Sequence, residues 1–474
     1  MLKKLLIIFS LLLLAVGAGG YFLIKSFTPV DIFKSAVVQE QIKKKVGDDK
    51  MDILNLSPAL LGFSKPITYL LLFQNNTELR PGGGFIGVYA VVKFDKGKMD
   101  LIKVEGTEVL DRNTPVDWKP EPPMILKKHL KVDRWYFRDA NWSPDFNQSA
   151  KKALELYQGE GGVMAEEIDV VAGITPTVVE ELLKLTGPIT VDGMEFTSEN
   201  VTEKLEYEVE YGYDEKGLHF LERKNILKPL MLELLKKLKL SAWSNFQSYL
   251  GLTQKLVEEK QILVYSVDLD LQKSLDAKDW TGRVKDTIGD YLLWVDANLA
   301  SLKTDHAVER VLNYKITPQA DGRFLATAEM AYNHTGRFDW RTSRYRTYAR
   351  VYAPLGSEFI SASGTMKLDR TAGVGEVDQG EELGKKWFGA FIAIEPGQTG
   401  RLSFSYLLPN TMSEKIKNGS YTLFVQKQLG LPEMGLTLWL DFGNNSGMEN
   451  NGDFVGSNYS YTGVMREDLE LVYH

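Results

Sequence analysis

The chain has 474 residues, of which 44% are hydrophobic and 25% charged, a composition typical of globular protein that excludes disordered and fibrous classes. Its 56 Lys and Arg against 63 Asp and Glu give a net charge of −7. No nucleic-acid partner is therefore expected, because binding to a phosphate backbone needs a basic surface. The absence of cysteine excludes disulfides, thiolate zinc sites, thiol nucleophiles and a lipid-modified N-terminal cysteine.

An uncharged run of 20 residues extends from Leu5 to Ile24, directly after Lys3 and Lys4. A helix of this length spans roughly 30 Å, the thickness of the hydrocarbon core of a bilayer. Residues 1–25 are therefore predicted to be a signal anchor, a single transmembrane helix. The two lysines predict a cytoplasmic N-terminus and place the bulk of the chain outside the cell membrane. A cleaved signal peptide is the alternative.

Residues 26–65 are predicted to form a stalk. From residue 66 to 302, apolar strands alternate with amphipathic helices, which predicts an α/β domain, a mixed sheet with flanking helices. The strands are expected at residues 67–73, 85–94, 99–104, 168–174, 189–191 and 262–267. Helices are expected after Ser143, after Thr175, after Thr197 or Ser198, over 222–260, and again from the last strand to about residue 300.

Residues 303–474 change to short strand-like runs separated by Gly, Pro or Asn. Such spacing predicts an all-β, immunoglobulin-like sandwich. Residues 443–463 are rich in Asn, Gly and Ser and are expected to form a long loop before a last strand at 469–473.

The first candidate ligand site follows the strand at 67–73. It consists of amide, carboxylate and guanidinium side chains followed by a glycine-rich turn: Asn75, Asn76, Glu78, Arg80, Gly83 and Gly84. Strand ends in α/β sheets are common binding places, and the planar fork of arginine pairs with phosphate or carboxylate. The alternative is a structural turn in which Arg80 pairs with a local acid. A dinucleotide site is not expected, because a strand and not a helix follows the glycines.

Three further groups are candidates. Arg138 and Asp139 lie in an aromatic-rich stretch before a helix, which could bind a metal, a sugar or a phosphate unless it is a self-paired loop. Arg223 begins a basic amphipathic helix, which either faces lipid headgroups or a polyanion or is simply solvated. A secondary surface is predicted where four side chains alternate onto one face of a strand and could hold an anionic polymer or sugar, or else be solvated: Arg344, Arg346, Tyr348 and Arg350.

Residues 69–87, YLLLFQNNTELRPGGGFIG, resemble the signature of the bacterial domain of unknown function 4012 family, and further segments up to residue 430 extend the resemblance. It implies a single-span envelope protein and assigns no activity. The order of elements is also similar to that of the LytR–CpsA–Psr envelope transferases. That similarity implies that Arg80, Arg138 and Arg223 bind the pyrophosphate of a polyprenyl-linked glycan, with Asp139 or Glu78 on a divalent metal such as Mg²⁺. The three arginines would then surround one apolar tunnel.

The sequence thus predicts an extracytoplasmic cell-envelope protein that binds an envelope glycan or a partner protein. No cofactor and no catalytic residue is predicted, since the chain has neither an H-E-x-x-H pair nor a G-x-S-x-G elbow. The alternative is a phosphotransferase of the LytR–CpsA–Psr kind that acts on polyprenyl-pyrophosphate-linked glycans.

Overall fold

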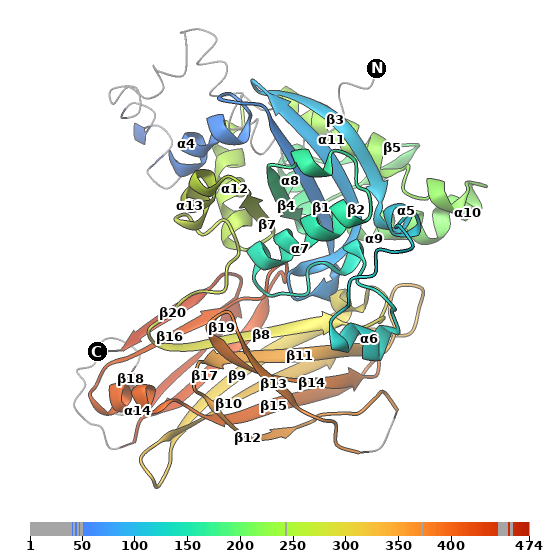
Figure 1. The fold of residues 1–474 in the computed structure, drawn as a ribbon. Coiled ribbons are helices and arrows are strands. Elements are labelled where there is room, and N and C mark those ends of the chain that lie inside the picture. The colour runs from blue at the N-terminus through green and yellow to red at the C-terminus, as the bar shows by residue number, and fades with distance from the viewer. Residues whose placement is uncertain are drawn as a thin grey trace.

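The computed structural model describes residues 40, 43–44, 47, 51–241, 244–370, 373–443, 454–455 and 458–473. The predicted membrane segment from Leu5 to Ile24 and most of the predicted stalk lie outside these residues. Among the residues described, no helix combines the length and the apolar character needed to cross a bilayer. The described chain forms an α/β domain packed on a β-rich C-terminal domain (Figure 1).

A five-stranded mixed sheet forms the centre of the α/β domain, with the strand order β3-β2-β1-β4-β7. Neighbouring strands are antiparallel except for the parallel pair β1 and β4. The strands are β1 (Ile67–Arg80), β2 (Gly83–Asp95), β3 (Lys98–Gly106), β4 (Val170–Ile174) and β7 (Ile262–Ser266). They were predictable because a sheet covered on both faces is built from nearly continuous apolar runs.

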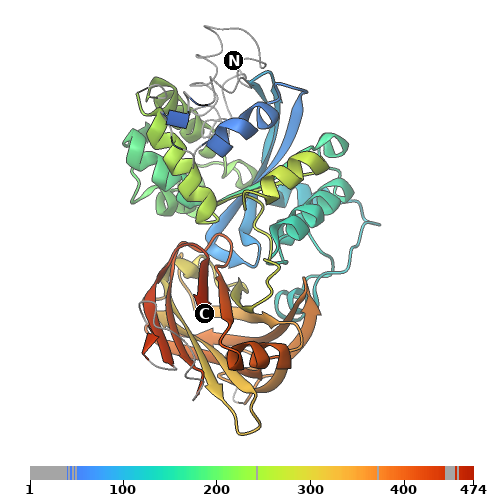
Figure 2. The same cartoon turned by 90° about the vertical axis from the view of Figure 1, so that its left-hand side faces the viewer.

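Helices cover both faces of this sheet, as Figure 2 shows. Alternate side chains of β1 enter different cores: Tyr69 and Leu71 face one, Leu70 and Leu72 the other. The first core is closed by α4 (Met51–Leu60), α8 (Pro176–Thr186), α9 (Val201–Tyr207), α11 (Leu227–Ser241), α12 (Phe246–Glu258), α13 (Leu269–Asp276) and the hairpin of β5 (Ile189–Val191) and β6 (Met194–Phe196). The second is closed by α5 (Thr107–Arg112) and α7 (Phe146–Gly159).

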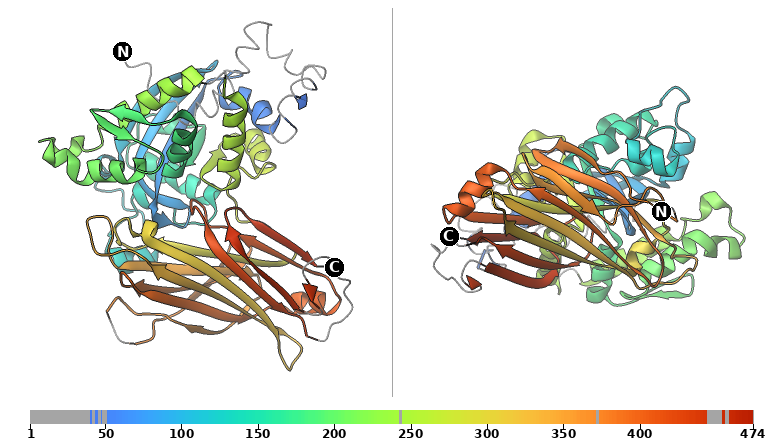
Figure 3. Two further views of the ribbon diagram at one scale, coloured as in Figure 1. Left: turned by 180° about the vertical axis from the view of Figure 1, so that it is seen from behind. Right: turned by 90° about the horizontal axis from the view of Figure 1, so that it is seen from below.

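Two sheets that share one hydrophobic core form the C-terminal domain (Figure 3). The seven-stranded sheet contains β12 (Glu358–Ser363), β15 (Thr399–Leu407), β10 (Phe324–His334), β9 (Val308–Pro318), β17 (Met434–Asp441), β19 (Asn458–Met465) and β18 (Phe454–Val455). The six-stranded sheet contains β13 (Asp378–Glu382), β14 (Lys385–Ile394), β11 (Tyr345–Pro354), β8 (Asp290–Asn298), β16 (Tyr421–Gln426) and β20 (Leu469–Tyr473). Helix α14 (Asn410–Lys417) packs beside β16, α10 (Tyr213–Glu215) follows α9, and α6 (Met124–Leu130) packs on β11 and β14 through Leu126.

The prediction for residues 268–300 was wrong in its second half. Strand β8 (Asp290–Asn298) replaces the expected helix and lies within the six-stranded sheet, so the C-terminal domain begins before residue 303. All nine residues of β8 are buried. Its sequence therefore lacks the polar–apolar alternation that distinguishes a half-exposed strand from a helix.

Other expectations also need correction. Helix α4 belongs to the α/β core, where Ile53, Leu54 and Leu60 are buried, so this end of the predicted stalk is part of the domain. Strands β18 and β19 occupy part of the expected loop at 443–463. An immunoglobulin sandwich consists of two antiparallel sheets. The parallel pairs β16 with β8 and β17 with β9 depart from that arrangement.

The end of β1 crosses from one domain to the other. Leu79 is buried in the core of the C-terminal domain, and its N–H donates to Asp305 Oδ2 at 3.0 Å. In return, residues 428–431 of the C-terminal domain reach the α/β domain, where Gly82 forms a parallel bridge with Leu429. The two domains are therefore joined through buried backbone and side chains.

Candidate functional site

An apolar pocket of about 250 Å³ lies between the sheet and helices α8, α9 and α11. Its apolar lining comes from the strands and from the helices: Phe73, Phe85, Val88, Val104, Ile174, Val179, Val201, Leu205, Val209, Leu227, Leu230 and Met231. A mostly apolar lining with a few polar groups is typical of small-molecule sites, whose volumes start at roughly 300 Å³. This cavity, called the apolar pocket below, is the candidate site.

Local irregularities of the chain shape this pocket. Strand β1 changes register against β2 after Phe73 and again after Asn75, and both residues line the pocket. Such irregularities re-aim side chains that a regular strand would bury in the sheet. On the opposite wall, α9 continues into a π-helical turn (Glu208–Gly212), whose Val209 and Glu210 complete the lining. π-helical turns are rare and occur frequently at functional sites.

A network of ion pairs borders the pocket and is called the charged border below. Glu210 pairs with Arg223 at 3.6 Å and with Lys303 at 3.0 Å. Glu108 pairs with Arg223 at 3.1 Å and with Lys224 at 2.5 Å. Each of these three cations therefore has a carboxylate partner within the protein.

Burial and these pairs act in opposite directions on the charged groups. Burial lowers the pKa of the Lys224 ammonium in spite of Glu108. Burial alone would raise the pKa of Glu108, but Lys224 and Arg223 hold it below its usual value. Burial also raises the pKa of Glu78, against the effect of Arg80. The charged border is thus partly desolvated, which strengthens each interaction made there.

Three of the predicted site residues line the apolar pocket: Asn75, Glu78 and Arg223. Asn75 donates to Glu206 Oε1 at 3.0 Å, which ties β1 to α9. Asn76 lies outside the pocket and donates to Thr177 Oγ1 and to the Gly430 carbonyl, both at 3.0 Å. The amides therefore hold protein segments together.

Arg80 does not line the pocket. It is only 3% exposed and lies over the Phe85 ring, with its guanidinium carbon 5.2 Å from the ring centre. Its Nε is 3.3 Å from Asp139 Oδ1, and its Nη2 is 3.3 Å from Glu78 Oε1. Its Nη1 donates to the carbonyl of Asn298 in the C-terminal domain at 2.7 Å. Arg80 therefore pairs with local acids in a structural turn, the second of the two possibilities that the sequence left open.

The glycine-rich turn allows β1 and β2 to lie close together. A Cβ atom on Gly83 would lie 2.4 Å from the Gln74 side chain, and Gly83 has a φ of +130°. A Cβ atom on Gly84 would lie 2.3 Å from the Asn75 carbonyl oxygen. Only glycine avoids these contacts, so the turn is required by packing and offers no open cradle for a ligand.

Arg138 and Asp139 are also used inside the protein. Arg138 donates to Asp111 Oδ2 at 2.9 Å, and the carboxylate of Asp139 receives Arg80. Asp139 and Glu78 therefore do not fit a divalent metal, because the Arg80 guanidinium already lies between them. Within the described part of the chain, no three His, Cys, Asp or Glu side chains are grouped in a way that could hold a metal ion.

The predicted secondary surface, which consists of Arg344 and three residues of β11, is covered. Arg344 pairs with Asp369 and Glu395, and Arg346 pairs with Asp369. Arg350 pairs with Glu382 and donates to the Trp142 carbonyl at 2.8 Å, and Tyr348 donates to Asp378 Oδ2 at 2.8 Å. Because Arg344, Tyr348 and Arg350 are buried, the face is neither an open binding surface nor a solvated one.

Sequence reasoning missed most of the pocket. Leu205, Val209 and Leu227 lie at positions where a helix normally packs on a core, and nothing in the sequence separates a pocket wall from a packed face. The charged residues Glu206 and Lys303 were missed because they come from distant segments. The available signals were Asn75 and Glu78 after the first strand and Arg223, which lies in the turn before α11 rather than at the start of the helix as expected.

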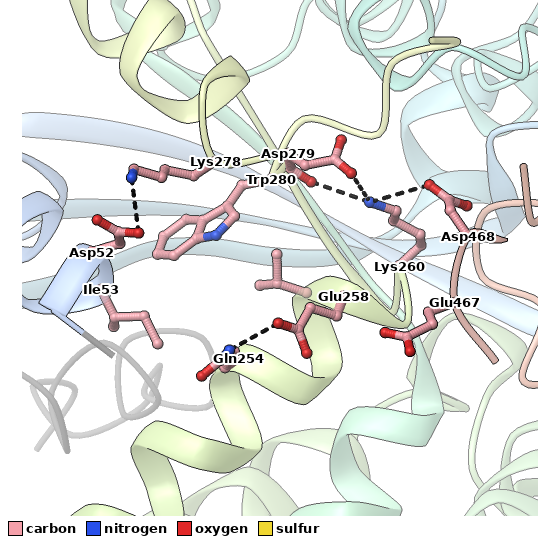
Figure 4. A pocket seen from close by; sticks show the side chains of 11 residues that line it. Asp52, Ile53, Gln254, Glu258, Lys260, Lys278, Asp279, Trp280, Glu467 and Asp468 are labelled. Atoms are coloured by element: carbon pink, nitrogen blue, oxygen red, sulfur yellow. Dashed lines mark hydrogen bonds and ion pairs between the residues drawn. The ribbon is translucent and has the colours of Figure 1, made fainter. Parts of the chain in front are cut away.

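A second cavity of about 390 Å³ lies between α4, α12, the loop before Trp280 and the turn at 467–468 (Figure 4). Figure 4 shows that its charged groups interact with one another: Lys278 with Asp52, Gln254 with Glu258, and Lys260 with Asp279 and Asp468. Of these pairs, only the one between Lys260 and Asp468, at 3.8 Å, ties the C-terminal turn to the α/β domain. The cavity therefore has the features of a domain contact rather than those of an apolar ligand site.

Residues 64–210 match the family model described as protein of unknown function (DUF4012). The resemblance to the domain of unknown function 4012 family is thereby confirmed for this segment. It contains β1, β2, β4, α8 and α9, and so most of the apolar pocket. No curated protein sequence matches the chain.

Several solved structures show a distant likeness. A nutrient-binding protein candidate from Legionella pneumophila is 10% identical and has a TM-score of 0.18, with 40% of this chain and 71% of that chain covered. A protease candidate from Parabacteroides distasonis is 10% identical with a TM-score of 0.18, covering 35% and 36%. An M1 zinc metallopeptidase from Deinococcus radiodurans is 10% identical with a TM-score of 0.14, covering 34% and 40%. TM-scores this low support no conclusion about fold or activity.

Proposed function

We propose that the protein is a binding module of the bacterial cell envelope whose apolar pocket holds the hydrocarbon chain of an amphiphile. The observation that carries the proposal is the pocket itself, in which twelve apolar side chains face one cavity beside a charged border. Burial of each CH₂ group contributes about 0.8 kcal/mol, so such a cavity favours an extended apolar chain. The charged border would receive the polar part of the same molecule.

The extracytoplasmic location belongs to the proposal and rests on the segment from Leu5 to Ile24. A membrane-anchored module outside the cell would meet lipids and lipid-linked intermediates. The sequence predicts that the protein binds an envelope glycan or a partner protein. The bound amphiphile or the C-terminal domain would make the contact with that partner.

The alternative of a polyprenyl-pyrophosphate transferase has one supporting observation, since Arg223 and Lys224 border an apolar cavity. It also requires Arg80 and Arg138 at the same cavity, and neither lines it. With Arg80 engaged by Asp139 and Glu78, these residues supply neither a free anion site nor a metal site. The arrangement therefore supports binding over phosphoryl transfer.

Filling the pocket is expected to abolish the binding of an apolar chain. The full chain in lipid nanodiscs is irradiated with decanoic acid that carries a diazirine on its chain, and labelled peptides are mapped by mass spectrometry. Labels are expected on peptides of α8, α9 and α11. The substitutions Leu205→Trp and Val179→Trp occupy the cavity and should reduce this labelling by about tenfold or more, which corresponds to roughly 1.4 kcal/mol.

Leu240→Trp is the matched control, because Leu240 lies on α11 with 80% of its surface exposed and outside the pocket. This variant should be labelled like the unchanged protein. Thermal unfolding of all variants shows whether each is folded. Labels on the predicted membrane segment are expected from probe dissolved in the nanodisc. Beyond that segment, labels only outside the pocket peptides, or equal labelling of folded pocket-filling variants, would contradict the proposed function.

A further inference from the structure

One side chain of the apolar pocket comes from the C-terminal domain. Of the described residues that line the pocket, Lys303 alone belongs to this domain, and all the others lie between residues 73 and 231. The Lys303 side chain is 16% exposed and extends across the domain boundary, where its Nζ lies 3.0 Å from Glu210 Oε1. The C-terminal domain therefore adds one cation to a pocket that the α/β domain otherwise builds.

The backbone that carries Lys303 is strained. Ala300 and Leu302 both adopt left-handed conformations, with φ angles of +57° and +52°. A bulky side chain such as leucine rarely takes this conformation, because its Cβ atom is then crowded by the backbone. The loop is nevertheless fixed, since the Lys303 N–H donates to the Arg341 carbonyl at 3.0 Å. Strained backbone that is held in this way is concentrated at functional sites and ligand clamps.

Glu210, the partner of Lys303, also lies in irregular backbone. It belongs to the π-helical turn that completes the pocket lining, and π-helical turns occur frequently at functional sites. Two unusual backbone segments from different domains thus meet at one ion pair beside the pocket. This meeting indicates that the polar end of a bound molecule lies at Glu210 and Lys303.

The charged border carries one excess positive charge. Its three cations face two carboxylates: Arg223, Lys224 and Lys303 against Glu108 and Glu210. The two remaining acids of the pocket lining, Glu78 and Glu206, are paired with arginines outside the border. They therefore do not offset the excess charge.

Lys303 also has the hydrogen-bonding capacity to bind an anion. Within the described part of the chain, its Nζ donates to one acceptor, Glu210 Oε1, whereas an ammonium group has three donors. The attraction between opposite charges is stronger in a partly desolvated site than in water. A head group with one negative charge would neutralise the charged border, and a neutral head group would leave the excess charge in place.

From these observations we infer that the head group of the amphiphile is a singly charged oxyanion, which Lys303 binds at the polar end of the apolar pocket. This inference rests on the proposed function and names the ligand class of the same pocket. A fatty-acid carboxylate and a lipid phosphodiester share this chemistry. The α/β domain then holds the chain and the C-terminal domain contacts the head group, so the ligand bridges the two domains.

Three photoreactive probes separate the head group from the chain. They share the diazirine-bearing decyl chain and end in a carboxylate, a methyl phosphodiester or a hydroxyl. Each is titrated against the full chain in nanodiscs, at a pH at which the acid is ionised. Lys303→Met should raise the half-saturating concentration for labelling of the pocket peptides about tenfold for the anionic probes, the loss of one charge-assisted hydrogen bond, and leave the hydroxyl probe unchanged. An effect on one anionic probe alone identifies which of the two head groups is bound.

Glu210→Gln distinguishes ligand binding from a purely structural ion pair. It removes the carboxylate that competes for Lys303, so it should lower the half-saturating concentration of the anionic probes. If the pair were only structural, Glu210→Gln would act like Lys303→Met. Lys386→Met is the matched control, because the Lys386 side chain is 17% exposed, pairs with Glu381 in the C-terminal domain and lies outside the pocket.

The possible outcomes separate this inference from the proposed function. Lys303→Arg keeps the charge and should bind the anionic probes nearly as the unchanged protein does, and thermal unfolding shows that each variant is folded. If none of the probes labels the pocket peptides of the unchanged protein, the proposed function fails. If Lys303→Met leaves both anionic probes unchanged or weakens the hydroxyl probe equally, or if Glu210→Gln weakens the anionic probes too, the pocket still binds chains and only the head-group inference is overturned.

Discussion

Replacing Arg80 by methionine is expected to lower the free energy of unfolding by about 3–5 kcal/mol, the cost of removing one partner from a buried ion pair. The substitution keeps most of the side-chain volume and removes the charge. Glu78 loses its guanidinium partner, and Asp139 keeps only Arg138 at 3.7 Å. The hydrogen bond to the Asn298 carbonyl, which joins the two domains, is lost as well. Urea unfolding followed by tryptophan fluorescence measures the effect.

Arg401→Met is the matched control for this prediction. Arg401 pairs with Glu329 at 2.6 Å, but its side chain is 69% exposed, so the same substitution should cost less than about 1 kcal/mol. Arg80→Lys should fall between the two, since it keeps a charge and loses the planar fork. If Arg80→Met were as stable as the control while the binding of an anionic amphiphile was lost, Arg80 would be a ligand residue after all.

The elements that were predictable share a local signal. Strands β1, β2 and β4 are continuous apolar runs, and α8 begins with Pro176 at its first position and ends at Gly187. Strand β8 lacked such a signal because two buried acids, Asp290 and Asp296, limit its apolar run to residues 291–295. The pairing of β8 with β16 and β11 depends on residues at least 49 positions away, which no local pattern reports.

The candidate site was harder to predict than the fold for a physical reason. The same types of polar residue occur in buried domain contacts and in ligand sites. The sequence does not show whether such a residue has its hydrogen-bond partners within the protein. Arg80 and Asn76 were read as ligand residues, but they bond to Asn298 and Gly430 of the other domain. Conversely, the apolar wall of the pocket has the pattern of a core-facing helix.

A buried pair of carboxyl groups makes the stability of the protein depend on pH. Glu160 accepts from the Phe137 N–H at 2.7 Å, and its other oxygen faces Asp111, which also bonds to Arg138. Burial, reinforced by the negative charge of Asp111, raises the pKa of Glu160 from 4.5 to about 9. With its pKa raised in this way, Glu160 is expected to carry a proton at neutral pH, on the oxygen that faces Asp111.

The sign of the effect follows from proton uptake. Between pH 4.5 and 9 the folded state binds a proton at Glu160 that the unfolded state does not, so stability falls as the pH rises through this window. Glu160→Gln keeps a donor toward Asp111 and an acceptor for Phe137 and has no proton to bind. Because each pH unit is worth about 1.4 kcal/mol, the variant should gain roughly 2–3 kcal/mol relative to the unchanged protein between pH 5 and 7.

Urea unfolding at half-unit steps of pH from 5 to 9 measures this difference. Glu166→Gln removes one carboxylate from an exposed position of the same domain and controls for the change in net charge. The difference between the two variants isolates the buried carboxyl from the general effect of charge. Parallel stability curves for Glu160→Gln and the unchanged protein would mean that Glu160 is ionised in the folded state. In that case Glu160 and Asp111 would both be ionised, and Arg138, which donates to Asp111, would be the cation that offsets their charges.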